Sequence, residues 1–191
     1  MKRLRRSLTG IAAALLLGCS AYAADNGWAV STDLAAWTRL CTINAGIQHA
    51  SGAHTSAGCT IEYNPFEFNS GESGTLRIRC FTPQLFLCIW PGSPFDGLYA
   101  KGKVLWSVYN VAGIKADSFP EGTLAGVGVG AGYCRRVGER FALSADIGTT
   151  AYLHNTTYYA GAHCGRILDR KKGFGLIPLD CSLSIICFIH R

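Results

Sequence analysis

The residues of this sequence that come nearest to a catalytic arrangement are His154 and the hydroxyl side chains that follow it, Thr156 and Thr157. A histidine that accepts the proton of a hydroxyl allows that hydroxyl to attack an acyl group, which is the chemistry of lipid hydrolases and acyltransferases. Such catalysis also needs a third group that orients the histidine, and no recognisable motif supplies one. We therefore predict that the protein is not an enzyme. A lipid-modifying enzyme centred on His154 is kept as an alternative.

The other histidines do not have the spacing of a metal site. His163 precedes Cys164, and His49 and His54 flank a Gly-containing turn. Zinc requires three or four convergent ligands, and no second cluster with ligand spacing accompanies either group. We expect no metal and no cofactor.

Residues 1–23 have the features of a cleavable secretory signal. A basic region, Lys2–Arg6, is followed by an apolar stretch, Leu8–Gly18, and by the small-x-small site Ala21–Ala23. Cleavage after Ala23 would leave one mature domain, residues 24–191. Leu16–Cys19 also resembles a lipoprotein cleavage box, which is the second reading of this leader.

The basic character of the chain belongs mainly to that leader. The chain has 18 Lys and Arg against 12 Asp and Glu, and four of the basic residues precede Leu8, so the mature chain is close to neutral. Nucleic acid is therefore not an expected partner. No apolar run behind the leader reaches the roughly 18 residues of a membrane helix, so a membrane crossing would have to use strands.

Most of the mature chain alternates apolar and polar residues with a period of two, which is typical of β-strands. In the last segment Leu179, Cys181 and Leu183 face one way while Asp180 and Ser182 face the other. About eight segments of this kind follow one another, separated alternately by short and longer connections. Their approximate ranges are 28–36, 41–49, 59–63, 76–89, 98–109, 126–133, 141–150 and 179–187.

Two details of this pattern carry specific predictions. In the fourth segment the apolar phase changes past Pro83, which we interpret as a β-bulge within Phe81–Pro83. The ranges 114–121 and 155–173 have no continuous apolar phase, and we expect them to be long loops.

Eight cysteines remain behind the leader, and an even number in an exported protein suggests disulfides. A cysteine on an apolar strand face behaves instead as a small hydrophobic residue. Five have that phase and are expected to be mostly unpaired: Cys41, Cys59, Cys80, Cys181 and Cys187. Cys88, Cys134 and Cys164 are less constrained, and no pairing is assigned.

The polar phase of the strands carries ionisable residues of nearly balanced sign. Inside a narrow closed cylinder such ions must be paired and hydrogen-bonded, so we predict an interior salt-bridge network. Its expected members are Asp33, Glu62, Arg77, Arg79, Lys101, Lys103, Asp146 and Asp180. A row of glycines on the same phase would leave room for the long side chains; it consists of Gly126, Gly128, Gly130 and Gly132.

These features predict an all-β fold, an eight-stranded antiparallel up-and-down transmembrane β-barrel of the outer-membrane type. A soluble barrel or sandwich would alternate equally well, so the decision depends on which face is interior. The bulky Trp, Leu, Ile and Phe residues share one phase, while Gly, Ser and charges fill the other, and the second set suits a narrow bore. A soluble periplasmic barrel that binds a small ligand remains an alternative.

Several short motifs, in this order, resemble a family of Bacteroidota outer-membrane β-barrels known only as domain of unknown function 3575. They are Trp28–Leu34, Tyr63–Phe66, Thr82–Gln84, Tyr109–Gly113 and Cys164-Gly165. The resemblance implies a small barrel, in some members beside genes for surface fimbriae, with no established catalytic residues to transfer. Family members often carry Cys-Gly-x-Cys in the last outer loop, and here Ile167 replaces the second cysteine.

A filled polar interior would block bulk flow, which argues against a porin. We expect a small Gram-negative outer-membrane protein that acts in envelope structure, surface interaction or the assembly of envelope and fimbrial proteins. Its expected partners are outer-membrane lipid, lipopolysaccharide phosphates contacted by the basic stretch Arg166–Lys172, and surface-appendage or envelope proteins.

Overall fold

The computed structural model describes residues 27–38, 41–69, 75–112, 118–160 and 166–189. The leader expected at residues 1–23, with Cys19, lies outside the described residues, as do His163, Cys164 and His190. The structure is all-β apart from one short helix. Its elements are β1 (Trp28–Asp33), α2 (Leu34–Thr38), β2 (Ile43–Gly52), β3 (Thr55–Asn64), β4 (Glu67–Asn69), β5 (Thr75–Ile89), β6 (Gly97–Ala112), β7 (Ser118–Val137), β8 (Phe141–Ala160) and β9 (Ile167–Ile189).

Eight antiparallel strands follow an up-and-down order and close into a ring. β1 pairs with β2, and β2 pairs with β3. β3 pairs with β5, each strand from β5 to β8 pairs with the next, and β9 returns to pair with β1. The short β4 pairs with the far end of β5. Closure satisfies the strand edges that an open sheet would leave unpaired. No helix among the described residues is long and apolar enough to cross a membrane.

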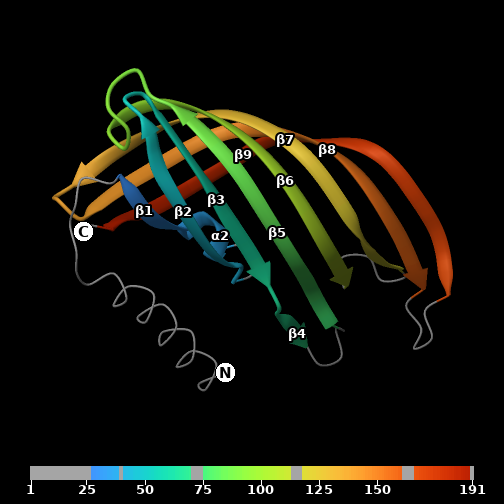
Figure 1. The fold of residues 1–191 in the computed structure, drawn as a ribbon. Coiled ribbons are helices and arrows are strands. Elements are labelled where there is room, and N and C mark those ends of the chain that lie inside the picture. The colour runs from blue at the N-terminus through green and yellow to red at the C-terminus, as the bar shows by residue number, and fades with distance from the viewer. Residues whose placement is uncertain (1–26, 39–40, 70–74, 113–117, 161–165, 190–191) are drawn as a thin grey trace.

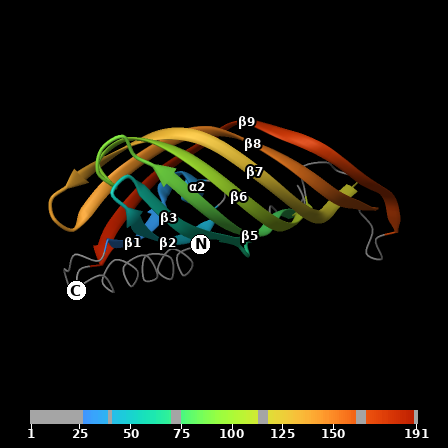
Figure 2. The same ribbon diagram turned by 45° about the horizontal axis from the view of Figure 1, so that its top comes forward.

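The two ends of the ring differ. Tight connections join β2 to β3, β5 to β6 and β7 to β8 at one end, where Trp28 and Ile189 also lie paired; we call it the short-turn end. Strands β7, β8 and β9 continue far beyond β1, β2 and β3 toward the opposite, long-strand end, as Figures 1 and 2 show from two directions. The ring is therefore much taller on one side.

The prediction of long loops at 114–121 and 155–173 is wrong for most of those residues. β7 already begins at Ser118, β8 continues to Ala160, and β9 begins at Ile167, with the last two paired along their length. These strand ends mix polar residues with adjacent apolar pairs, Tyr158-Tyr159 and Ile167-Leu168, so that apolar and polar residues do not alternate. Their sequence therefore lacks the apolar phase by which strands are recognised.

The predicted bulge in β5 is also wrong. β5 keeps one register against β3 from Cys80 to Ile89, and one register against β6 from Arg77 to Ile89. Residues directly opposite each other in antiparallel strands point to the same face. Cys80 lies opposite the buried Asn64, so Leu76, Ile78 and Cys80 have the inner phase.

The buried apolar core lies at the short-turn end, inside the ring. It packs aromatic rings from the β5–β6 connection against β9: Trp90 and Phe95 have centroids 5.9 Å apart, and Phe95 meets Phe188 edge-on at 5.3 Å. Tyr99 stacks on Trp90 at 4.6 Å. We call Trp90, Phe95, Tyr99 and Phe188 the aromatic plug.

Candidate functional site: the filled interior of the ring

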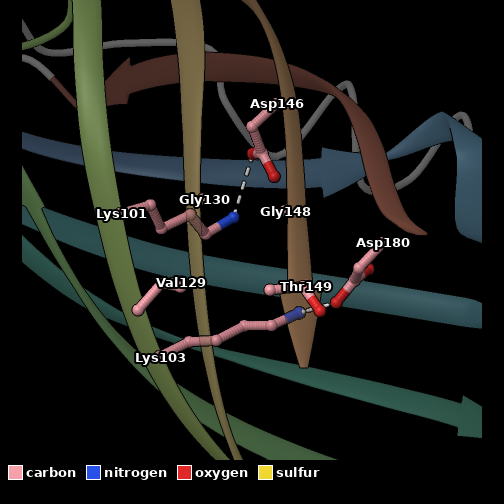
Figure 3. A pocket seen from close by; sticks show the side chains of 8 residues that line it. All are labelled: Lys101, Lys103, Val129, Gly130, Asp146, Gly148, Thr149 and Asp180. Carbon is pink, nitrogen blue, oxygen red and sulfur yellow. Dashed lines mark hydrogen bonds and ion pairs between the residues drawn. The ribbon is translucent and has the colours of Figure 1, made fainter. Parts of the chain in front are cut away.

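Asp146 of β8 is the centre of the polar layer above the aromatic plug. Its Oδ2 atom accepts hydrogen bonds from Lys101 Nζ at 3.0 Å, from Tyr99 OH at 3.0 Å and from Ser182 Oγ at 2.6 Å. The donors come from β6 and β9, so the carboxylate connects three strands across the interior. Figure 3 shows its contact with Lys101. A partly buried carboxylate with three donors is the arrangement that makes an interior charge tolerable.

Asp180 of β9 forms the next layer toward the long-strand end. Lys103 Nζ makes an ion pair with Asp180 Oδ2, and Thr150 Oγ1 donates to the same oxygen at 2.9 Å. Lys101 and Lys103 both point inward because they are two residues apart on β6, and each reaches its own carboxylate (Figure 3). Among the described residues, these two ion pairs lie in adjacent layers of the interior.

The space around these ion pairs is nearly filled. A cavity of about 10 Å³ lies between the two pairs, which is the volume of roughly one water-sized probe. A second cavity, of about 50 Å³, lies between Asp146 and the aromatic plug and is bordered by Gln48 and Ser184. Both of these cavities beside the ion pairs are therefore small.

Two further predicted residues face the interior but join other partners. Glu62 Oε1 accepts a hydrogen bond from Gln84 Nε2 at 2.9 Å. Asp33 lies where β1 ends, and its Oδ1 atom accepts the backbone N–H of Ala35 at 2.9 Å and of Leu183 at 3.0 Å. Asp33 therefore caps α2 and takes a donor on β9 beyond the point where β1 stops pairing.

Arg77 and Arg79 were predicted in the interior, and the structure places them on the outer face. Both lie in outer phase on β5, and both contact Glu67 of β4: Arg79 Nη2 at 2.9 Å and Arg77 Nη1 at 3.7 Å from Glu67 Oε2. The cause is the continuous register of β5. Without a bulge, the arginines share the face of Phe81 and Leu85.

The glycines of β7 lie on the inner phase beside the long interior side chains. A Cβ added to Gly128 would come within 2.8 Å of Lys103 Cε, and one added to Gly132 within 2.5 Å of Tyr99 Cζ. At Gly126 and Gly130 an added Cβ would approach the backbone of β8, at 2.7 Å from a carbonyl oxygen in each case. Gly128 thus leaves room for Lys103, which reaches Asp180, and Gly132 leaves room for Tyr99, which reaches Asp146.

Near the long-strand end the interior contains a short hydrogen-bonded chain. His154 Nδ1 lies 2.9 Å from Thr156 Oγ1, and Thr156 Oγ1 lies 2.5 Å from Tyr109 OH. The two β8 residues share a face because they are two positions apart. Thr156 itself is buried.

The cysteines differ from the prediction at two positions. Cys41 precedes β2, with a backbone φ of 61°, and Cys80 has the inner phase. Cys59, Cys181 and Cys187 have the outer phase, as alternation predicts. Cys88 and Cys134 are buried in the core around the aromatic plug. Cys41, Cys59, Cys88, Cys134 and Cys181 are free thiols. Within the described ranges no group of three His, Cys, Asp or Glu side chains is placed to hold a metal ion.

The aromatic plug is the part of the interior that alternation does not indicate. Phe95 lies in a turn, with a backbone φ of 66°, and only 1% of its surface is exposed. A non-glycine residue in this left-handed region is strained, and burial of a large ring offsets that cost. In the sequence, this core is indicated by the presence of Trp90 and Phe95 in the short connection between β5 and β6.

The outer face changes from apolar to polar in successive rows of paired residues toward the long-strand end. One row is apolar and contains Trp106, Ala125, Leu153 and Phe174. The next is mixed and contains Phe81, Val108, Thr123, Asn155 and Lys172. The third is polar throughout and contains Arg79, Asn110, Glu121, Thr157 and Arg170.

Comparison with known proteins gives one match. No curated protein and no solved structure matches the chain. The family described as "Protein of unknown function (DUF3575)" matches residues 11–189, which is nearly the whole chain. The order of short motifs along the strands and the match over that length agree, and the chain belongs to the DUF3575 family.

Proposed function

We propose that the protein is a small β-barrel of the Gram-negative outer membrane, exported by its leader, which acts without catalysis in envelope structure and surface interaction. The outer rows carry this proposal. On β7 the outer positions from Ala125 to Tyr133 are all apolar and exposed. This length matches the roughly 9–11 residues that a transmembrane strand needs.

The location of the charges supports the same proposal. Lys101, Lys103, Asp146 and Asp180 lie inside the ring and are paired, while a soluble barrel would place its apolar side chains there. Thr149 is a polar residue among the apolar ones of the outer face, and its hydroxyl has a partner: Oγ1 donates to the carbonyl oxygen of Ile177 at 2.9 Å. A polar group in lipid has no water to bond, so this pairing is what a lipid environment requires.

The filled interior favours a structural or interaction role over transport. The two cavities described beside the ion pairs and the aromatic plug are small, which argues against a path for bulk solute there. The projecting ends of β7, β8 and β9 then become the surface through which the protein meets envelope or appendage proteins. Both described chain ends lie at the short-turn end, which in barrels of this type faces the periplasm.

Substitution of Val129 by arginine tests the membrane location. Val129 is 67% exposed in the middle of the apolar part of β7, and Val129→Arg is expected to lower the free energy of unfolding in a bilayer by about 2–4 kcal/mol. The measurement is urea unfolding in phospholipid vesicles, followed by tryptophan fluorescence. Thr157→Arg, in the polar row, is the control and should lose less than about 1 kcal/mol. A mature chain that is monomeric and folded in plain buffer would contradict the proposal.

A second candidate, a lipid-modifying enzyme, is favoured by one observation. The structure brings His154 Nδ1 within 2.9 Å of Thr156 Oγ1, as general-base activation of a hydroxyl requires. Burial of Thr156 and its bond to Tyr109 argue for a structural role, which is why this candidate ranks second. Mass spectrometry of lipid A decides between them: the first proposal expects the same lipid A from cells expressing wild type and His154→Ala. A modification lost with His154→Ala, while Thr157→Ala retains it, would reverse the ranking.

A further inference from the structure

An apolar groove lies on the outer face of β6 to β9, where the apolar rows end toward the long-strand end. Ala125 forms its floor, because its small side chain lies between Trp106 and Leu153 in the same row. Phe174 continues the wall on β9, paired with Leu153. The groove has a volume of about 610 Å³ and is open to the outside of the ring. An apolar group that lies against the outer face can therefore enter it.

The end of the groove nearest the long-strand end is polar and cationic. Thr123, Asn155 and Lys172 follow one another in the next row, and all three border the groove. Lys172 makes no ion pair with any residue that the structure describes, whereas the neighbouring Lys171 is paired with Asp169 at 3.4 Å. The groove thus joins an apolar trough to one unpaired cation and two uncharged hydrogen-bonding side chains.

We propose that this groove binds one acyl chain of a phosphorylated glycolipid from the outer leaflet. The phosphate pairs with Lys172, and sugar hydroxyls bond to Asn155 and Thr123. The inference rests on the proposed function, which places the long-strand end outside the cell. A phosphate at Lys172 gains charge-assisted hydrogen bonds, and basic residues at a membrane surface attract anionic lipid. The two uncharged groups favour a phosphate attached to a sugar over a simple phospholipid headgroup.

Native mass spectrometry of the purified full chain in nonionic detergent tests the proposal. The probe is diphosphorylated lipid A, with phosphatidylglycerol added in a parallel experiment. One lipid A per chain is expected. Ala125→Leu fills the floor of the groove, and Lys172→Glu reverses the charge; each should weaken lipid A binding by roughly fivefold or more.

The matched control is Val127→Leu, which adds a methylene to the outer face of the same strand outside the lining of the groove. Its lipid A binding should equal that of wild type. Wild-type binding by Ala125→Leu would overturn the groove, and equal binding of phosphatidylglycerol and lipid A would overturn the glycolipid. Lys172 is exposed and polar, so Lys172→Glu should fold normally. It therefore still tests the proposal if Ala125→Leu folds poorly.

The outcome is separable from that of the proposed function. A chain that needs a bilayer to fold but retains no lipid A would contradict the groove alone. A chain that folds without lipid or detergent would contradict the membrane location instead.

Discussion

Replacement of Asp146 by alanine is expected to lower the free energy of unfolding by about 3 kcal/mol or more, because it leaves an interior ammonium group without its counter-ion. The side chains of Asp146 and Lys101 are 14% and 22% exposed, so water screens the pair only partly. The substitution also removes the acceptor of Tyr99 OH and Ser182 Oγ. Urea unfolding in vesicles measures the loss.

The double variant Asp146→Ala with Lys101→Met is the control for the uncompensated charge. It removes both ions and should recover a large part of the lost stability. Ser182→Ala, which removes one neutral donor, should cost about 1 kcal/mol. A single Asp146→Ala variant as stable as wild type would show that the ion pair contributes nothing to the fold.

Replacement of Phe95 by alanine is expected to cost about 3–5 kcal/mol, because it leaves a cavity among rigid aromatic rings. Phe95 contacts Trp90 on one side and Phe188 on the other. Phe141→Ala, at the same end but 40% exposed, is the matched control and should lose markedly less. The measurement is again urea unfolding in vesicles.

Conductance in planar bilayers gives the same variants a second readout. Neither wild type nor Phe95→Ala should show large steady openings, since the two ion-pair layers still fill the interior of the variant. An equal loss of stability in Phe95→Ala and Phe141→Ala would contradict the assignment of Phe95 to a packed core. Large steady openings in wild type would contradict the filled interior.

The alternation of residues predicts correctly which segments become strands and that the strands are antiparallel and up-and-down, because each such strand in a ring has two different faces. For that reason the four paired charges lie inside the ring, and apolar residues next to them in the same strand point outward. These charges are Lys101, Lys103, Asp146 and Asp180. Which cation meets which carboxylate depends on the stagger between strands. That stagger is a property of the closed ring and is not visible in any one segment.

Arg77 and Arg79 show where the same reasoning fails. A charge on a strand marks the inner phase only where the outer face is apolar. Near the long-strand end the outer face is itself polar, so the arginines lie outside and pair with Glu67. The apolar residues of β5 change phase near Pro83 because the polar part of the outer face meets the apolar part there, and not because of a bulge.

The aromatic plug and the length of β8 and β9 were not predicted, for two different reasons. Phe95 belongs to a turn, and its inward position depends on a left-handed backbone conformation that has no sequence period. The strand ends at Asn155–Ala160 and Ile167–Lys172 are held by pairing with each other. Their apolar residues stand in adjacent pairs, Tyr158-Tyr159 and Ile167-Leu168, so no alternating apolar phase marks them.

The unequal height of the wall gives the projecting part of the molecule a front and a back. β1 stops at Asp33 and β2 begins at Ile43, whereas β8 and β9 continue past them toward the long-strand end, so the projecting wall stands on one side of the ring (Figure 2). At the proposed membrane location, a macromolecule approaching along the membrane normal would therefore meet a curved wall on one side rather than a symmetrical rim. Because the wall stands on one side, a partner that binds there would have one fixed orientation about that normal.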